Sequence, residues 1–588
     1  MAELPSDNTT RRYSSRLHGQ NVVGGFQNLW ERKLMCDTTL VVQGKAFQVH
    51  RCYLASCSQY FYIMFTEGFQ ECNQTEVELK GVTAKGLEAM LHYVYTGTIE
   101  LNQDNVPDVL EASSHLQFKD VQKFCAEYLK EELSVDNCLQ FLKVTELYAL
   151  EWTKSDIMNF MFENFVSVAQ QAEFSTISVD LLCELLADDS LNAESELLVF
   201  RIAVRWLKHE PDRYNHAERV LRLVRFGLMT PEEMEVVYSN EIMMLPSCRE
   251  LLQMTLNYHM KLFQQPIIDT PIARPRSYVD SLLVFGAGKT DNSLSNLVLA
   301  TRIDNKDLVG FTAIGKPKEA RYFAAVAVLN NFVFVVGGQT AMAGDGSHAT
   351  NSAFRYNPRD GKWLQISSMS TPRTHFALVA LPDCLIAVGG KHNRVAVASV
   401  EKYSFQENEW SKAPKLSSTL FSHAGCAHSG RVYISGGCPG EDFTDHVHCY
   451  DPAREAWQLK SPMNQSRGYH IMVPHRDKIF VCAGNTNAGN RADVMHTEMY
   501  DVERDQWSMV AAISQGQSEA PAVRYGSCFF ILGGYSWNMR SFQDTIQRYD
   551  MDTDEWTVID TKLPEAMTGV VASYLKLPHR VYQYNATE

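Results

Sequence analysis

The feature that most constrains the fold of this chain is a glycine pair that recurs through its C-terminal half. Each copy follows a short apolar run, and the copies are Gly337-Gly338, Gly389-Gly390, Gly436-Gly437, Ala483-Gly484 and Gly533-Gly534. Their second glycines are 52, 47, 47 and 50 residues apart, and a weaker copy, Gly286-Ala287-Gly288, lies 50 residues upstream of the first. A near-constant period of this length is typical of a repeat architecture. The chain therefore carries six units.

A tyrosine followed seven residues later by a tryptophan recurs in five of these units. The pairs are Tyr356/Trp363, Tyr403/Trp410, Tyr450/Trp457, Tyr500/Trp507 and Tyr549/Trp556. Each unit reads as about four short strands around a glycine turn. Because one such sheet cannot bury both of its faces, the sheets are expected to pack face to face around a closed ring. We predict an all-β, six-bladed propeller over residues 280–577.

The first unit indicates how the ring closes. It begins near Ser281 without a preceding apolar strand, and Phe311 stands in the region where the other units carry their tryptophan. An extra apolar segment, residues 569–575, follows the last tryptophan. This segment is expected to complete the first blade.

The N-terminal half is of another kind. Residues 40–48 read as two short strands around Gly44, and residues 50–65 and 87–95 have the apolar spacing of helices. From Ser134 onward helical spacing dominates, and three prolines precede the propeller. The predicted divisions are a disordered tail (1–20), an α/β domain (21–133), an all-α domain (134–265), a linker (266–279), the propeller and a second tail (578–588).

Composition excludes several classes of function. The formal charge is −15 and no run of basic residues occurs, so the chain lacks the electrostatic footprint of a protein that binds nucleic acid or anionic membranes. The first twenty residues lack the apolar core of a secretory signal, and the 14 cysteines form no C-x-x-C pair. The expected location is the cytoplasm, with the nucleus or the cytoskeleton as alternatives.

Two motifs suggest chemistry but are better explained by the fold. Gly288-Lys289-Thr290 resembles the end of a P-loop, yet Leu283 stands where that loop needs a glycine. His446 and His448 place two imidazoles on one strand face, whereas a zinc site needs three or four converging ligands. We expect no cofactor, no metal and no catalytic activity.

Three sets of motifs resemble known domains. Residues 37–40, 47–51, 54–56, 60–61 and 64–65 (DTTL, FQVHR, LAS, YF and MF) resemble a BTB domain. Asn137-Cys138-Leu139, Glu196, Val199-Phe200, Trp206-Leu207, Arg225-Phe226 and Leu228-Met229 resemble a BACK domain. The glycine pairs with their Tyr/Trp pairs resemble kelch repeats. This order of domains is similar to that of the kelch-like family.

The resemblance implies a function. Kelch-like proteins are substrate-recognition adaptors of cullin-3 RING E3 ubiquitin ligases: the BTB domain dimerises and binds the cullin, and the propeller binds the substrate protein. Such an adaptor is a non-catalytic subunit that acts by proximity. The alternative from another class is an actin-type cytoskeletal scaffold without a ligase role.

The resemblance also implies candidate residues in the BTB domain. A helix predicted over residues 22–34 carries Phe26, Leu29 and Trp30 on one stripe, and we expect it to form the homodimer interface. The alternative is packing within its own domain. Met64, Phe65, Phe69 and Glu71 are expected to bind cullin-3, with a solvated loop as the alternative at Phe69 and Glu71.

Loops between the units are expected to form the mouth of the propeller. Counting 16 residues back from the first residue of a glycine pair gives Arg321, Arg373 and Arg467, and the equivalent positions of the other units lack an arginine. These arginines suit an acidic or phosphorylated peptide; alternatively, they tie neighbouring blades together. The full set of predicted substrate-binding residues is Arg321, Tyr322, Arg373, His375, His423, Arg467, Tyr469 and Trp537.

Overall fold

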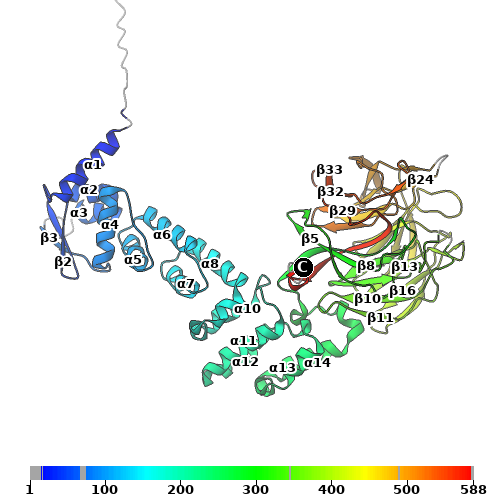
Figure 1. Ribbon diagram of the computed structural model, residues 1–588, viewed down its shortest axis with the longest axis horizontal. Coiled ribbons are helices and arrows are strands. Elements are labelled where there is room, and N and C mark those ends of the chain that lie inside the picture. The colour runs from blue at the N-terminus through cyan, green and yellow to red at the C-terminus, as the bar shows by residue number, and fades with distance from the viewer. Residues whose placement is uncertain (1–14, 16, 67–73, 344–345, 488–490, 584–588) are drawn as a thin grey trace, which may run out of the picture. The chain divides into compact units, whose positions relative to one another are not determined.

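The computed structural model describes residues 15, 17–66, 74–343, 346–487 and 491–583, and it divides into two compact units, Met1–Ser178 and Val179–Glu588 (Figure 1). The first unit contains a small sheet and the blue to cyan helices. The second contains further helices and all the sheets coloured from green to red. None of the helices in these ranges has both the length and the apolar character that crossing a membrane requires.

The sheet of the first unit has the order β2-β1-β3. β1 (Thr38–Val42) and β2 (Lys45–Val49) form an antiparallel hairpin, and β3 (Glu76–Glu78) lies parallel to β1. The two strands predicted around Gly44 are confirmed, and Gly44 has the positive φ of 78° that a tight hairpin turn favours. The third strand was not predicted, because three residues are too few to show an alternating pattern.

The helices of the first unit pack around this sheet and continue beyond it. The helix predicted over residues 50–65 is in fact two helices, because Ser58 is extended and its hydroxyl donates to the carbonyl of Leu116 at 2.7 Å. The helices are α1 (His18–Glu31), α2 (Arg51–Cys57), α3 (Gln59–Thr66), α4 (Ala84–Thr96), α5 (Val106–His115), α6 (Lys119–Glu131), α7 (Cys138–Leu147), α8 (Glu151–Glu163) and α9 (Phe165–Gln170), followed by a 3-10 turn, Ala172–Thr176.

The second unit begins with helices that lead into the propeller. They are α10 (Val179–Ala187), α11 (Glu196–His209), α12 (Ala217–Leu221), α13 (Pro231–Tyr238) and α14 (Arg249–Met260), joined by 3-10 turns at Pro211–His216, Phe226–Leu228, Glu241–Met244, Pro246–Cys248, Leu262–Ile267 and Pro271–Ala273. The predicted linker lies at the end of this segment. It is packed rather than extended, since Ile272, Ala273 and Arg276 are buried.

The propeller has six blades, and the predicted fold class is confirmed. From the axis outward the strand orders are β34-β4-β5-β6 in blade 1 (with β7 on β5), β8-β9-β10-β11 in blade 2, β12-β13-β16-β17 in blade 3, β18-β19-β20-β21 in blade 4, β22-β23-β26-β27 in blade 5 and β28-β29-β32-β33 in blade 6. Blades 3, 5 and 6 also carry small hairpins that were not predicted: β14-β15, β24-β25 and β30-β31.

The blade strands are short except where blade 1 closes the ring. Their bounds are β4 (Tyr278–Lys289), β5 (Val298–Asp304), β6 (Asp307–Leu308), β7 (Thr312–Gly315), β8 (Ala325–Leu329), β9 (Phe332–Val336), β10 (Ala353–Asn357), β11 (Lys362–Ile366), β12 (Ala377–Ala380), β13 (Cys384–Val388), β14 (Lys391–His392), β15 (Val395–Ala396), β16 (Val400–Ser404), β17 (Glu409–Ala413), β18 (Ala424–His428), β19 (Arg431–Ser435), β20 (Val447–Asp451), β21 (Ala456–Lys460), β22 (Ile471–His475), β23 (Lys478–Cys482), β24 (Asn485–Thr486), β25 (Ala492–Asp493), β26 (Thr497–Asp501), β27 (Gln506–Val510), β28 (Ala522–Tyr525), β29 (Cys528–Leu532), β30 (Tyr535–Ser536), β31 (Ser541–Phe542), β32 (Ile546–Asp550), β33 (Glu555–Ile559) and β34 (Met567–Pro578).

The last strand closes the ring as predicted. β34 pairs antiparallel with β4, so the C-terminal segment supplies the innermost strand of blade 1. It also contacts β8 and β28, the inner strands of the two adjacent blades. Buried apolar side chains from facing sheets form a core between adjacent blades, for example Phe334 of blade 2 with Leu385 of blade 3.

The recurring residues hold each blade to the previous one. Tyr500 and Trp507 are direct partners across β26 and β27, with ring centroids 5.0 Å apart. The Trp507 indole donates to the carbonyl of Ser461, which follows the last strand of blade 4, at 2.8 Å. Equivalent bonds from the other four tryptophans reach Lys316, Ser367, Pro414 and Ala511. The seven-residue spacing is therefore the signature of a clamp between blades.

Two predicted tails are shorter than expected. α1 begins at His18, so it takes in the end of the tail predicted over residues 1–20 and starts before the helix predicted over residues 22–34. At the other end, α15 (Arg580–Gln583) lies within the tail predicted over residues 578–588. The Tyr582 hydroxyl donates to Ser281 Oγ at 2.8 Å, and its ring packs against the core of blades 1 and 2.

Candidate functional site

The α1 surface combines rings packed on the first unit with apolar side chains left in solvent. Phe26 stacks on Tyr53 with centroids 4.4 Å apart, and Trp30 stacks on Tyr95 at 4.6 Å. Leu29 is half-buried on the same helix. The sequence left open the alternative that these residues pack within their own domain. The two stacked pairs show that the Phe26 and Trp30 rings do so, at least on one face. Dimerisation through Phe26, Leu29 and Trp30 stays a prediction.

Five apolar residues on α1 or just beyond its ends remain exposed. They are Leu17, Val22, Val23, Leu34 and Met35. Exposed apolar side chains on and beside one helix suit contact with another protein surface. Sequence reasoning missed these residues because it took the larger aromatic rings for the interface.

α3 carries the described part of the predicted cullin-binding set. Met64 and Phe65 are half-buried near its C-terminal end. The Phe65 ring stacks on Phe61 at 5.9 Å, and the Arg51 guanidinium lies 5.6 Å above it. Phe69 and Glu71 lie outside the described residues. The prediction for all four residues is untested.

Six residues in left-handed backbone conformation ring the axis of the propeller, one from each blade. They stand at the start of the innermost strands with φ between 50° and 59°, and they are Phe323, His375, Ser422, Tyr469, Glu519 and Gly569. We call this set the axial ring. Side chains in this conformation cost on the order of 1 kcal/mol each, and such strain concentrates at functional sites.

Backbone hydrogen bonds pass from blade to blade along the axial ring. The N–H of Ser422 donates to His375, that of Tyr469 to Ser422, that of Glu519 to Tyr469 and that of Gly569 to Glu519, at 2.8 to 3.1 Å. The ring lies at the opposite end of the strands from the helical segment. Asn330, which follows the other end of β8, donates to the carbonyl of Pro266.

The three predicted arginines are buried inside the blades. Each donates through Nη1 to the carbonyl 16 residues later, which explains the spacing in the sequence: Gly337 for Arg321, Gly389 for Arg373 and Ala483 for Arg467. Arg373 and Arg467 also pair with Glu401 and Glu498 at 2.7 and 2.6 Å. We therefore correct the prediction that these guanidinium groups bind substrate. They connect strands within one blade, rather than neighbouring blades as the alternative proposed.

Tyr322, His375 and Tyr469 gather at the axial ring. The ring centroids of His375 and Tyr469 lie 5.7 Å apart. The centroid of the Phe323 ring lies 3.8 Å from that of His375 and 4.2 Å from that of Tyr322. Burial lowers the pKa of His375 to about 3, so this imidazole is neutral. Contact of these residues with a substrate stays a prediction.

His423 and Trp537 lie apart from this cluster. His423 is buried between blades, since a Cβ at Gly389 of blade 3 would lie 2.9 Å from its Cε1. Its placement as a mouth residue is therefore corrected. Trp537 is half-buried in the turn between β30 and β31, with the Arg491 guanidinium 4.7 Å from its ring.

Four members of the axial ring are absent from the predicted substrate-binding set: Phe323, Ser422, Glu519 and Gly569. Phe323, Ser422 and Glu519 stand two residues after Arg321, Leu420 and Gln517, as His375 stands two residues after Arg373. This fixed offset would have found them. Gly569 contributes to the axial ring through its lack of a side chain, because a Cβ there would lie 2.3 Å from the Tyr322 phenol ring. The glycine thus leaves room for Tyr322.

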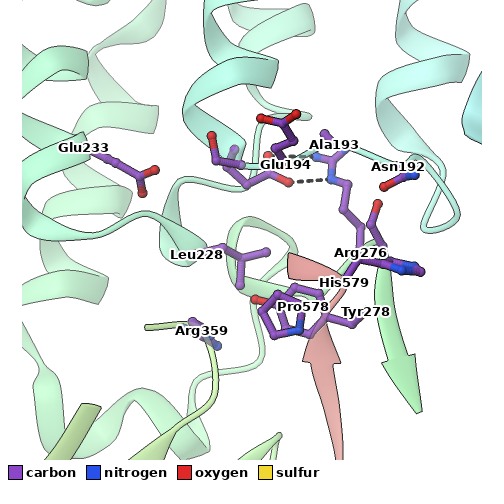
Figure 2. Close-up of a pocket in the computed structure, with 13 residues that line it drawn as sticks. Asn192, Ala193, Glu194, Leu228, Glu233, Arg276, Tyr278, Arg359, Pro578 and His579 are labelled. Atoms are coloured by element: carbon purple, nitrogen blue, oxygen red, sulfur yellow. Dashed lines mark hydrogen bonds and ion pairs between the residues drawn. The ribbon is translucent and has the colours of Figure 1, made fainter. Parts of the chain in front are cut away.

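A second cluster joins the helical segment to the propeller. Arg276 lies 2.7 Å from Glu196 of α11 and donates to the carbonyls of Leu186 and Leu223. Arg359, in the turn between β10 and β11, donates to the Tyr258 hydroxyl of α14 at 2.5 Å. Both arginines line a cavity of about 60 Å³ (Figure 2). Because both guanidinium groups bind other parts of the fold, this cluster connects the helical segment to the propeller.

Within the described ranges, no group of three or more His, Cys, Asp or Glu side chains is arranged to hold a metal ion. His446 and His448 lie with ring centroids 6.3 Å apart, and His446 is exposed. The candidate sites are therefore the α1 surface, the end of α3 and the axial ring.

Comparison with known proteins agrees with this organisation. Three family profiles match in order: BTB/POZ domain over residues 26–133, BTB And C-terminal Kelch over 138–239, and Attractin/LZTR1 beta-propeller over 282–541. They define the class of chains in which a BTB domain is joined through a BACK domain to a β-propeller.

Full-length relatives narrow the assignment. The chain is 33% identical to Kelch-like protein 26 of Danio rerio over 577 residues, which cover 97% of this chain and 95% of that protein. It is 34% identical to Kelch-like protein 26 of Homo sapiens (96% and 93% covered) and 33% identical to Kelch-like protein 36 of Mus musculus (95% and 92% covered). The chain belongs to the kelch-like family, as its motifs predicted. This membership supports an adaptor role, and adaptors of this family are generally non-catalytic.

Proposed function

We propose that this protein is the substrate-recognition adaptor of a cullin-3 RING E3 ubiquitin ligase. In this proposal the BTB domain forms a homodimer through α1 and binds cullin-3 through the end of α3. The propeller binds the protein to be ubiquitinated at its axial ring. The observation that carries the proposal is that one chain matches kelch-like proteins over 97% of its length and joins a BTB domain to a propeller.

The residues at the end of α3 and at the axial ring support these two separate binding roles. Met64 and Phe65 offer half-buried apolar side chains at the end of α3, which suits a protein–protein contact of moderate size. At the propeller, strained aromatic residues gather around one axis, away from the helical segment. Ubiquitination by such an adaptor needs no nucleophile of its own, because holding a substrate lysine near a charged E2 raises its effective concentration.

The first test is a calorimetric titration of the full chain with the cullin-3 N-terminal domain. We expect submicromolar binding by the wild type and its loss in Phe65→Ala and in the Phe69→Ala/Glu71→Ala double variant. Lys45→Ala, on the exposed strand β2, is the matched control and should bind as the wild type does. Circular dichroism must show that each variant is folded.

The titration also separates the proposal from its alternative. A folded wild-type chain that does not bind cullin-3 would refute the ligase role and leave the cytoskeletal scaffold to be tested by co-sedimentation with actin filaments. Binding that survives the double variant would place the cullin contact elsewhere on the BTB domain.

A further inference from the structure

Glu519 is a recessed carboxylate at the axis of the propeller. Solvent reaches part of its side chain, yet burial raises its pKa, so protein atoms crowd the carboxyl group. The Thr568 hydroxyl donates to Oε2 at 2.7 Å, and the Tyr322 hydroxyl also forms a hydrogen bond to it. Both partners are neutral donors. Within the described residues, no Lys, Arg or His forms an ion pair with Glu519.

A crowded carboxylate without an ion-pair partner is costly, because buried charges in proteins are normally paired. The chain keeps this group at a strained position, since Glu519 has a φ of 59°. It also positions donors for it. Gly569 has no side chain and thereby admits the Tyr322 ring, whose hydroxyl reaches the carboxylate. The arrangement holds an acceptor in place, and no described cation forms an ion pair with it.

Aromatic rings flank this carboxylate. The Tyr469 carbonyl accepts a backbone hydrogen bond from Glu519, and burial together with the nearby Glu519 carboxyl raises the pKa of the Tyr469 phenol to about 12. The Phe323 ring lies 5.9 Å from Tyr469 and 4.2 Å from Tyr322. Aromatic faces beside a carboxylate attract cations, because the negative face of a ring adds to the charge of the acid.

We propose that the axial ring receives a basic side chain, lysine or arginine, of the protein that the propeller binds, with Glu519 as its counter-charge and the rings of Tyr322, Phe323 and Tyr469 as its walls. This inference rests on the proposed function and names the substrate class of that same site. It replaces the acidic or phosphorylated peptide predicted from the three arginines, whose guanidinium groups are buried in the blades.

Arg491 is a cation near this site, and it supplies an independent check. Its positive charge opposes the rise in the Glu519 pKa, and its guanidinium is held 4.7 Å from the Trp537 ring. A basic ligand that approaches Glu519 is repelled by the positive charge of Arg491. Removing the charge of Arg491 should therefore strengthen binding, whereas removing the charge of Glu519 should weaken it.

The test is selection of random dodecapeptides displayed on phage against the full chain, followed by fluorescence anisotropy of the selected peptides. We expect the selected peptides to share a lysine or arginine. Replacing that residue by norleucine or citrulline should abolish binding, and the two replacements distinguish a lysine site from an arginine site. Affinity should fall by about 30-fold or more in Glu519→Gln and rise in Arg491→Gln.

Controls separate this inference from folding and from the adaptor proposal. Glu503→Gln changes an exposed acid in the turn between β26 and β27 and should leave peptide affinity unchanged. Glu519→Gln must unfold at the wild-type temperature or above and must still bind the cullin-3 N-terminal domain. Selected peptides without a shared basic residue, affinity that survives Glu519→Gln, or no selected peptide at all would overturn the inference. A chain that binds basic peptides through Glu519 but not cullin-3 would refute only the ligase role.

Discussion

The Arg373 guanidinium and the Glu401 carboxylate meet at 2.7 Å inside blade 3, where their side chains are 0% and 2% exposed. Arg373 also donates to the carbonyl of Gly389, and Glu401 accepts from the backbone N–H groups of Ser370 and Thr371. The pair thus connects strands of blade 3 to the loop that follows the last strand of blade 2. Blade 6 fills the same positions with Gln517 and Gln547, whose amides hydrogen-bond at 2.6 Å.

This substitution between blades suggests a stability test. Arg373→Ala leaves a buried carboxylate unpaired, so we expect it to lower the free energy of unfolding by about 3–5 kcal/mol. The double variant Arg373→Gln/Glu401→Gln reproduces the neutral pair of blade 6 and should lose less than Arg373→Ala. Denaturant unfolding of the full chain, followed by tryptophan fluorescence, measures both. Equal losses would show that charge pairing at Glu401 is unimportant. The exposed pair Arg222/Glu218, neutralised in the same way, is the control.

The tryptophan clamp between blades gives a second prediction. Trp507→Phe keeps an aromatic ring against Tyr500 but removes the indole donor to Ser461. We expect a loss of about 1 kcal/mol in the free energy of unfolding, the usual contribution of one hydrogen bond. Trp152→Phe on α8 is the matched control, because Trp152 is 91% exposed and should leave stability unchanged. Equal stability of Trp507→Phe and the wild type would contradict the clamp.

The repeated part of the fold was predictable because each repeat makes the same contacts. The seven-residue Tyr/Trp spacing is that of two strands joined by a tight turn, and the 16-residue spacing is that of an arginine and the carbonyl it binds. Neither spacing says whether the arginine faces a ligand. That depends on Glu401, which lies 28 residues away in the chain and closes around Arg373 only in the folded blade.

The axial site was less predictable because it arises where the repeats differ. Glu519, Phe323 and Gly569 occupy one position in three blades but have no chemistry in common. Only the closed arrangement of the six blades brings the Tyr322 hydroxyl of blade 2 close to the Glu519 carboxylate of blade 6. The strand β3 was not predicted because its three residues are too few to show an alternating pattern. In addition, its parallel partner β1 lies 37 residues earlier, since Thr39 pairs with Glu76, and parallel pairing leaves no turn signal between the two strands.

Substitutions on α1 separate dimerisation from folding. Val22 and Val23 are exposed, so Val22→Glu/Val23→Glu should yield a monomer that unfolds at the wild-type temperature. Phe26→Ala/Trp30→Ala should instead lower the unfolding temperature, because both rings stack on tyrosines of their own domain. Sedimentation velocity reports the oligomeric state, and thermal unfolding reports stability. A dimer that persists in the double glutamate variant would exclude this face of α1.

The junction between the helical segment and the propeller should depend on Arg276. Its side chain is almost fully buried and binds Glu196 together with two backbone carbonyls. Arg276→Ala should therefore speed amide hydrogen exchange over residues 262–279 while leaving the blade strands protected. Arg274→Ala changes an exposed arginine two residues earlier and is the matched control. Unchanged exchange in Arg276→Ala would show that Arg359 and the apolar contacts hold the junction alone.

The buried histidines predict how stability depends on pH. Burial lowers the pKa of both His375 and His423 to about 3. An imidazole in the unfolded chain titrates near pH 6.5, so between about pH 6.5 and pH 3 the unfolded chain binds more protons than the folded chain. Stability must therefore fall as the pH is lowered through this window, by about 1.4 kcal/mol per pH unit for each such histidine.

His423→Gln tests this dependence, because glutamine cannot be protonated in this range. Between pH 6 and pH 5 the free energy of unfolding of the variant should fall less steeply than that of the wild type, by about 1.4 kcal/mol per pH unit. His446→Gln, at an exposed position, should keep the wild-type slope. Denaturant unfolding of the full chain at a series of pH values measures the slopes. Parallel curves for His423→Gln and the wild type would mean that His423 is protonated in the folded blade, against its burial between blades 3 and 4.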